Sequence, residues 1–236
     1  MKERDNQKSI KPTLTIAGAG ARIMEEDDLI DLSCDARGCA SNCCTKSAPV
    51  VLNPYEIALI CREASMSYED LLDIVETDRA KSFPLVMLPR DPVCSFWTGK
   101  GCRIYAARPL ACRLYPLGRV YDGGRSLIVQ PELNICPGLA PDPLHTVADY
   151  LRVQDTDLLV HMADQWIEFV NDMERMPLPD RAVTSVAFHL LVYSPDTPPA
   201  PAASAELSSI EDVFLLRLDS ARSQIPRFLK IGPDSA

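Results

Sequence analysis

Nine cysteines constrain this chain more than any other feature, because four of them lie within eleven residues. They form a dense group followed by a dispersed one: Cys34, Cys39, Cys43 and Cys44, then Cys61, Cys94, Cys102, Cys112 and Cys136. The chain has only three histidines, so a soft-metal site would consist mainly of thiolates. Thiolates select zinc, copper(I) or iron–sulfur clusters over hard cations. We therefore expect one metal- or cluster-binding module spanning Cys34 to Cys136.

The adjacent pair Cys43 and Cys44 limits how such a site can be built. Neighbouring side chains in an extended chain point to opposite faces, so the pair cannot easily close one tetrahedral site. The two could serve two ions or two edges of a polynuclear centre, or one of them could be a buried small hydrophobe.

Cys61 differs from the other cysteines because it shares a helical apolar face with Ile57, Ile60 and Ala64. Free cysteine is among the most buried residue types, so we predict a core position for Cys61. Eight candidate metal ligands remain: Cys34, Cys39, Cys43, Cys44, Cys94, Cys102, Cys112 and Cys136.

Composition narrows the class of protein. A chain of 236 residues suits one domain or a domain with an extension, and no apolar run reaches the roughly 18–20 residues of a membrane span. The polar N-terminus does not resemble a signal peptide, so we expect a cytoplasmic protein whose clustered cysteines bind metal rather than form disulfides. The formal charge of −9 argues against nucleic acid as a partner.

The patterns predict an α+β fold, mostly helical, in three parts. Residues 1–30 are expected to be a flexible lead-in, and 31–140 an irregular cysteine-rich metal-binding module with short β-hairpins. Residues 141–236 are expected to form a helical C-terminal region with a proline-rich linker at 194–203.

Within the module, capping residues Asn53 and Ser67 predict helix starts, the second helix continuing to about Asp78. Spaced prolines exclude a long helix after it, and 85–88 could be an edge strand. Hairpins are predicted around 98–101 and around 122–124, with a short helix at 109–116. These elements would fold the dispersed cysteines back onto the dense group.

The apolar patterns predict helices in the C-terminal region. One apolar stripe predicts a single helix from 146 to about 173, and 181–193 suits a buried helix or a strand. A capping box beginning at Ser208 predicts a last helix that ends at Pro226. His161 lies beside the stripe and is interpreted as a structural residue rather than a ligand.

Eight thiolates could fill two four-cysteine zinc sites, or four of them could hold one [4Fe–4S] cluster while the others are structural. Both kinds of centre carry a net charge of about −2, which neighbouring arginines could offset. The candidates are Arg37, Arg103, Arg108 and Arg113. The sequence contains no GxSxG, P-loop or HExxH motif.

The residues around the cysteines carry a resemblance. The chain reads Cys34-x4-Cys39-x3-Cys43-Cys44, then Cys94-Ser-Phe, Gly101-Cys102-Arg-Ile-Tyr105, Arg108-Pro-x-x-Cys112-Arg-x-Tyr115-Pro116 and Cys136-Pro-Gly. Over about residues 34–140 this resembles the YkgJ-type cysteine-cluster family, described as a zinc- or iron-chelating domain. A related arrangement occurs in flagellin lysine N-methylases, and that distant resemblance would imply dependence on an iron–sulfur cluster and S-adenosylmethionine.

Two hypotheses follow. The first is an accessory metal-binding protein, with zinc or an iron–sulfur cluster, whose helices between 146 and 228 offer a surface to a protein partner. The second is an enzyme, either an iron–sulfur-dependent protein lysine N-methyltransferase or a redox enzyme, because there are more thiolates than one structural site requires.

Overall fold

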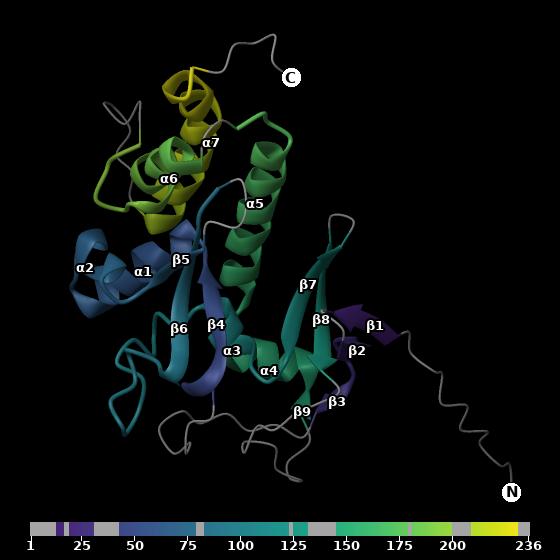
Figure 1. The fold of residues 1–236 in the computed structure, drawn as a ribbon. Coiled ribbons are helices and arrows are strands. Elements are labelled where there is room, and N and C mark those ends of the chain that lie inside the picture. The colour runs from purple at the N-terminus through teal and green to yellow at the C-terminus, as the bar shows by residue number, and fades with distance from the viewer. Residues whose placement is uncertain are drawn as a thin grey trace, which may run out of the picture.

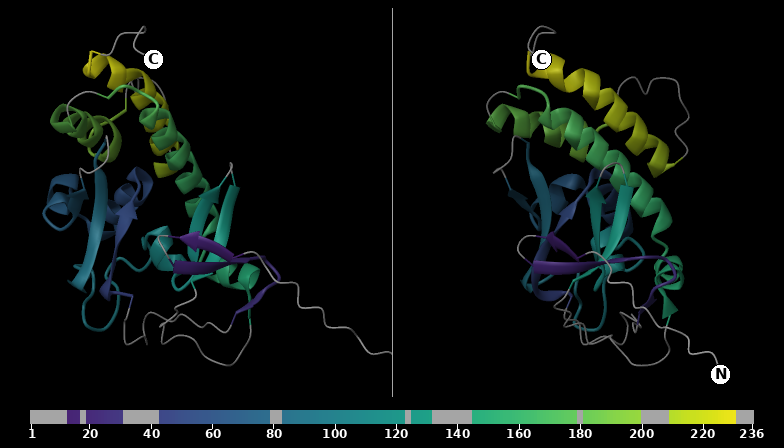
Figure 2. Two further views of the ribbon diagram at one scale, coloured as in Figure 1. Left: turned by 45° about the vertical axis from the view of Figure 1, so that its right-hand side comes forward. Right: turned by 90° about the vertical axis from the view of Figure 1, so that its right-hand side faces the viewer.

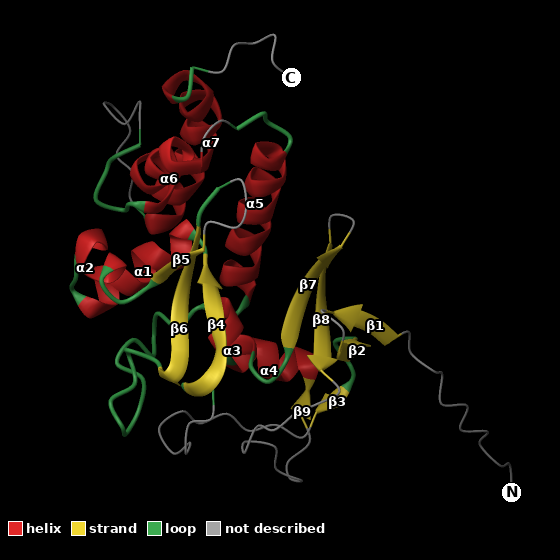
Figure 3. Ribbon diagram, in the orientation of Figure 1, coloured by secondary structure: helices red, strands yellow, loops and turns green. Residues whose placement is uncertain are grey.

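The computed structural model describes residues 13–16, 19–30, 43–78, 83–122, 125–131, 145–178, 181–199 and 209–230. The predicted α+β fold with a predominance of helix is confirmed (Figures 1 and 3). Three small antiparallel sheets lie beside and below a group of long helices near the C-terminal end of the chain.

The sheet nearest the cysteines has the strand order β4-β6-β5: Thr45–Leu52, Leu85–Val93 and Glu76–Asp78. The prediction of an edge strand at 85–88 is wrong, because β4 and β5 pair with opposite sides of β6 there. Proline lacks the N–H that a ladder needs. Accordingly, the β4–β6 register shifts between Ser47 and Val50, opposite Pro89.

The predicted helix starts are confirmed. Helix α1 (Pro54–Ala64) has a capping box between Asn53 and Glu56, and α2 (Tyr68–Leu72) has one between Ser67 and Asp70. Helix α2 ends at Leu72 rather than near Asp78, because residues 76–78 pair with β6 instead. A third short helix, α3 (Leu110–Leu114), lies within the predicted span 109–116.

The second sheet has the order β1-β2-β8-β7: Thr13–Ile16, Ala19–Met24, Arg125–Pro131 and Gly118–Asp122. Its β7–β8 hairpin is the one predicted around 122–124. Both β1 and β2 lie within the predicted lead-in of residues 1–30, and β2 pairs with β8, which satisfies its backbone groups. A third, two-stranded sheet joins β3 (Leu29–Ile30) to β9 (His145–Thr146).

The predicted single helix from 146 to 173 is two helices, α4 (Val147–Val153) and α5 (Asp157–Glu174). They are separated at Asp155, whose φ of 51° lies in the left-handed region and cannot continue a right-handed helix. After the break, Leu159 faces the core and is 4% exposed, whereas Leu158 is 44% exposed.

The segment 181–193 is helical rather than extended, formed by α6 (Arg181–Phe188) and a π-helical turn, η1 (His189–Tyr193). Helix α7 (Ile210–Phe228) begins one residue later than predicted, with Ser209 as its cap, and continues past Pro226. Of the predicted linker 194–203, the structure describes 194–199, where Asp196 accepts a hydrogen bond from the backbone N–H of Tyr68 at 2.8 Å.

One apolar core extends through the cysteine-rich module and the C-terminal helices. Phe83, beside β6, stacks on Phe188 of α6 with ring centroids 5.2 Å apart. Figure 2 shows α5, α6 and α7 gathered above the sheets, which they cover at one end. Among the described residues, every helix falls short of the length and apolar character needed to cross a membrane.

Candidate metal centre

One cavity of about 50 Å³ is lined by cysteines from three separate segments of the module. Its thiols belong to Cys43, Cys44, Cys94, Cys102 and Cys112. All five are free thiols. Apolar side chains, including Phe96 and Trp97, form much of the remaining wall. A water molecule requires about 10–15 Å³ of such space, so the cavity has room for a metal ion.

The main chain around the adjacent cysteines is fixed by hydrogen bonds. The carbonyl oxygen of Cys44 accepts the backbone N–H of Cys94 at 2.8 Å. The guanidinium of Arg90 donates from Nη1 to the Cys43 carbonyl at 2.9 Å and from Nε to the Ala48 carbonyl at 2.7 Å. These bonds hold the start of β4 against the end of β6.

The loop after β6, which ends at Val93, carries Cys94 and Cys102. Figure 3 shows this loop extending from the end of β6. The predicted hairpin of two strands is wrong in detail, because pairing is limited to one bridge between Trp97 and Cys102. Residues 94–97 and 104–107 instead form turns closed by backbone hydrogen bonds. The predicted consequence still holds, since both cysteines reach the same cavity.

Cys112 is positioned by α3, whose start is held by a buried carboxylate of α1. Glu56 accepts the backbone N–H of Leu110 at 2.7 Å through Oε1 and that of Asn53 at 3.0 Å through Oε2. Glu56 is only 4% exposed, and burial raises the pKa of its carboxyl group. One side chain therefore caps α1 and anchors α3.

The thiols of the cavity differ in acidity. A hydrogen bond from Cys44 lowers the pKa of Cys43 to about 6, aided by the charge of Arg90 and opposed by burial. The same hydrogen bond raises the pKa of Cys44. Burial raises the pKa of Cys112 to about 12. A bound metal ion would reverse this pattern, because a coordinating thiol is deprotonated.

Backbone N–H groups also point at two of the sulfurs. Burial raises the pKa of Cys94, while hydrogen bonds from the N–H groups of Phe96 and Trp97 lower it. Burial likewise raises the pKa of Cys102, and the N–H of Ile104 opposes it. Donors of this kind stabilise sulfur in its charged form, the form that binds metal.

The donor set fits zinc or iron better than a hard cation, because it consists of soft thiolates with cationic neighbours. Within the part of the chain that the structure describes, no three Cys, His, Asp or Glu side chains are already arranged around a common metal position. Ligands of structural metals often reach their final geometry only on binding. Of the eight predicted ligands, five share the cavity, whereas Cys34, Cys39 and Cys136 lie outside the described residues.

The predicted arginines have different surroundings. Arg108 lines the cavity, is 8% exposed and lies over the Tyr105 ring at 3.7 Å. Arg113 is directed elsewhere, donating to backbone carbonyls such as that of Gln154 at 2.7 Å. Arg103 is exposed beside Phe96, and Arg37 lies outside the described residues.

The sequence reasoning missed Arg90, which also lines the cavity and is 9% exposed. Alternation along β6 could have identified it, since Val86, Leu88 and Arg90 share the buried face. Cys61 is confirmed as a core residue at 6% exposure, and burial raises its pKa to about 11. His161 is exposed and does not line the cavity.

The chain was compared with curated proteins, solved structures and protein-family models. No curated protein and no solved structure matches the chain. Residues 33–136, which include all five cysteines of the cavity, match the CxxCxxCC family model. This segment is therefore similar to the CxxCxxCC family, described as "Putative zinc- or iron-chelating domain".

Proposed function

We propose that the chain binds zinc or an iron–sulfur cluster through cysteine thiolates and serves as an accessory protein rather than as an enzyme. One observation carries the proposal: five cysteines spread over residues 43–112 line one cavity. Cys34, Cys39 and Cys136, which flank this set in sequence, would complete eight donors. When bound, the metal would supply cross-links between the segments that carry the thiolates.

The surroundings of the cavity favour a structural role for the metal. The cavity joins the start of β4, the loop after β6 and α3, which come from separate parts of the chain. A structural zinc site in a small module contributes on the order of 10–16 kcal/mol of apparent binding free energy. Arg90 and Arg108 would offset the negative charge of the metal thiolate centre.

Anaerobic purification, followed by elemental analysis and an absorption spectrum, tests the proposal. We expect stoichiometric zinc in a colourless protein, or iron and sulfide with a broad visible band. Cys112→Ser should lose at least half of the bound metal, whereas Cys61→Ser should retain it, because Cys61 lies outside the cavity. Purified protein without metal, or equal metal content in both variants, would refute the proposal.

We further propose that the C-terminal helices provide the surface for a protein partner. Supporting this, Val183, Val186 and Leu190 are about half exposed and recur at helical spacing along α6 and η1. The double variant Val186→Asp/Leu190→Asp should lose a protein that co-purifies from the source organism while keeping the metal. A co-purifying protein that survives this change would contradict the assignment.

A further inference from the structure

Charged residues are segregated along the sequence on either side of β6. Residues 63–78, before the strand, contain carboxylates and no lysine or arginine: Glu63, Glu69, Asp70, Asp73, Glu76 and Asp78. Residues 92–121, at its end and beyond, contain cations and no carboxylate: Lys100, Arg103, Arg108, Arg113 and Arg119. The chain therefore carries one acidic and one cationic segment, joined by β6.

The exposed part of the acidic segment lies on and just after α2. Glu69, Leu72 and Asp73 are exposed, and their spacing of three and four residues places them on one face of the helix. Glu76 follows at the start of β5 and is also exposed. None of these three carboxylates has an ion pair with a described residue. We call these four residues the acidic patch.

The exposed part of the cationic segment lies on the loop after β6. Lys100 and Arg103 are exposed, and neither has an ion pair within the described part of the chain. The Arg103 guanidinium lies 5.5 Å from the centroid of the Phe96 ring. Val93 and Tyr105 are 43% and 37% exposed and add apolar surface. We call Val93, Lys100, Arg103 and Tyr105 the cationic patch.

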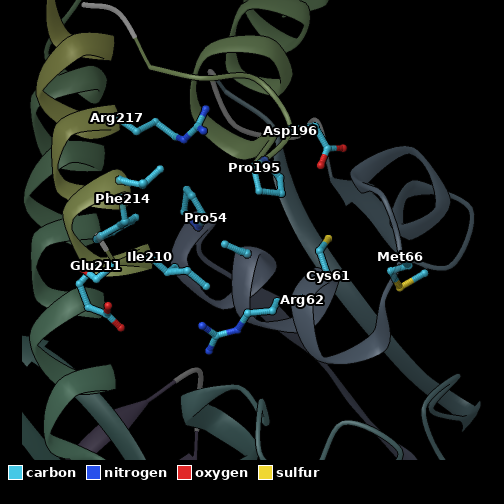
Figure 4. Close-up of a pocket in the computed structure, with 13 residues that line it drawn as sticks. Pro54, Cys61, Arg62, Met66, Pro195, Asp196, Ile210, Glu211, Phe214 and Arg217 are labelled. Carbon is cyan, nitrogen blue, oxygen red and sulfur yellow. The ribbon is translucent and has the colours of Figure 1, made fainter. Parts of the chain in front are cut away.

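The pocket in Figure 4 shows charges that are balanced within the chain. It lies between α1, α7 and the segment after η1 and has a volume of about 630 Å³. Arg62 extends toward Glu211, and Arg217 extends toward the segment that carries Asp196. Each cation offsets a carboxylate of the same pocket. The acidic and cationic patches have no such partner among the described residues, so their charges are available to another molecule.

The two patches lie on the same side of the molecule, near opposite ends of β6. Helix α2 precedes β5, which pairs with the first residues of β6, and the loop leaves its last residue. Figure 1 and the left view of Figure 2 both place α2 and this loop on the side away from β7 and β8.

The distance between the patches prevents them from neutralising each other within one chain. The strand has nine residues and a rise of about 3.3 Å per residue, so roughly 30 Å separates its ends. The electrostatic screening length at physiological ionic strength is only about 8 Å.

We propose that this side of the molecule binds a second copy of the chain about a two-fold axis, so that the acidic patch of each copy meets the cationic patch of the other. A two-fold interface repeats each contact, so opposite charges meet at both of its ends. Leu72 of one copy then faces Val93 and Tyr105 of the other. The formal charge of −9 on each copy does not prevent this, because distant like charges are screened whereas charges in contact are not.

A second copy fits better than an unrelated acidic protein. An acidic protein would cover the cationic patch and leave the acidic patch unmatched, whereas a second copy matches both patches in one contact. The surface is distinct from the exposed valines and leucine of α6 and η1, and the proposal is independent of the metal centre.

Sedimentation velocity of the metal-loaded full chain at low and high salt tests the proposal. We expect a dimer at low salt, with a dissociation constant that rises at least tenfold at about 1 M salt, where the screening length falls to about 3 Å. A monomer at low salt, a dimer that is indifferent to salt, or an assembly larger than a dimer would each overturn the proposal.

Charge reversal locates the interface. Lys100→Glu/Arg103→Glu gives a chain in which both patches are acidic, and Glu69→Lys/Asp73→Lys gives one in which both are cationic. Each variant alone should be monomeric because like charges would meet at both ends of the interface. An equimolar mixture of the two should form a heterodimer.

The control Arg152→Glu/Arg175→Glu changes the net charge as much as Lys100→Glu/Arg103→Glu does, at exposed arginines outside both patches. It should remain dimeric, and circular dichroism should be unchanged in all variants. Dimers of either patch variant alone, a mixture without heterodimer, or dissociation of the control would overturn the assignment. Val186→Asp/Leu190→Asp should also remain dimeric, and a monomer there would place the interface on α6 and η1 instead.

Discussion

Arg90 donates a hydrogen bond of 2.9 Å to the carbonyl oxygen of Cys43, so a buried cation on β6 holds the backbone just before β4. The same guanidinium reaches the Ala48 carbonyl, and it lines the cavity that contains five thiols. Its role is therefore both structural and electrostatic: it fixes the start of β4 and places positive charge beside sulfur atoms that become thiolates when metal binds.

Replacing Arg90 should affect both stability and metal retention. Arg90→Met would leave two inward carbonyl groups without their donor, at a cost of about 1–3 kcal/mol each. We expect lower stability in urea and faster metal loss to a competing chelator. Arg103→Gln, which changes an exposed arginine on the loop after β6, serves as the control. If both variants release metal at the wild-type rate, Arg90 does not support the centre.

Glu56 offers a second test because its carboxylate joins the starts of α1 and α3. Glu56→Gln keeps one acceptor oxygen but cannot accept from both Asn53 and Leu110, so we expect a loss of about 1–3 kcal/mol in unfolding free energy. Glu63→Gln, on the exposed side of α1, should change stability by less than about 0.5 kcal/mol. Comparable effects in the two variants would argue against the anchoring role.

The bond between Tyr55 and Glu211 predicts a dependence on pH. It lowers the pKa of Glu211 below its ordinary value of 4.5. The stabilisation is therefore complete above that value and is lost as the pH falls through the lower pKa of the folded state. Tyr55→Phe should cost about 1 kcal/mol at neutral pH, allowing for solvent screening of this carboxylate, and progressively less in acid.

Denaturant titrations of the wild type and Tyr55→Phe at a series of pH values measure this difference. A free-energy gap that stays constant from neutral pH down to about pH 3 would show that Glu211 does not gain its stabilisation from the Tyr55 hydroxyl. A gap that widens in acid would have the wrong sign for a lowered pKa.

Metal removal should destabilise the chain as one unit, because the module and the C-terminal helices share a core. The two tryptophans provide local probes: Trp97 lines the cysteine cavity and Trp166 packs against Phe169 within α5. In Trp166→Phe and Trp97→Phe variants, fluorescence from the remaining tryptophan should report the same fall in midpoint after chelation. A midpoint that falls only for Trp97 would indicate separate folding units.

Short-range signals predicted much of this fold. The capping boxes at Asn53 and Ser67 and the turn at 122–124 were readable because their hydrogen bonds join residues a few positions apart. The start of α7 was misplaced by one residue because Ser208 and Ser209 offer equivalent hydroxyl groups, of which Ser209 is the cap. The break at Asp155 was missed because the apolar stripe continues on both sides of one left-handed residue.

Contacts between residues far apart in the sequence were harder to predict. The central position of β6 depends on partners 38 and 11 residues upstream, as in Leu88 with Val50 and Met87 with Glu76, and its prolines suggested an edge. The meeting of Cys43, Cys94 and Cys112 could be predicted only as a consequence of soft-metal chemistry. Arg90 was overlooked because a charged residue between prolines resembles a loop until the alternation of β6 is recognised.

The stacking of Phe83 on Phe188 has a practical consequence for anyone who wishes to transplant the cysteine-rich segment. A fragment trimmed at residue 140 would carry an uncovered aromatic surface into water, because α5, α6 and α7 supply the other side of that contact region. We expect such a fragment to aggregate even when it is loaded with metal. The cysteine-rich segment should therefore be transferred to another protein only together with the C-terminal helices that cover its core.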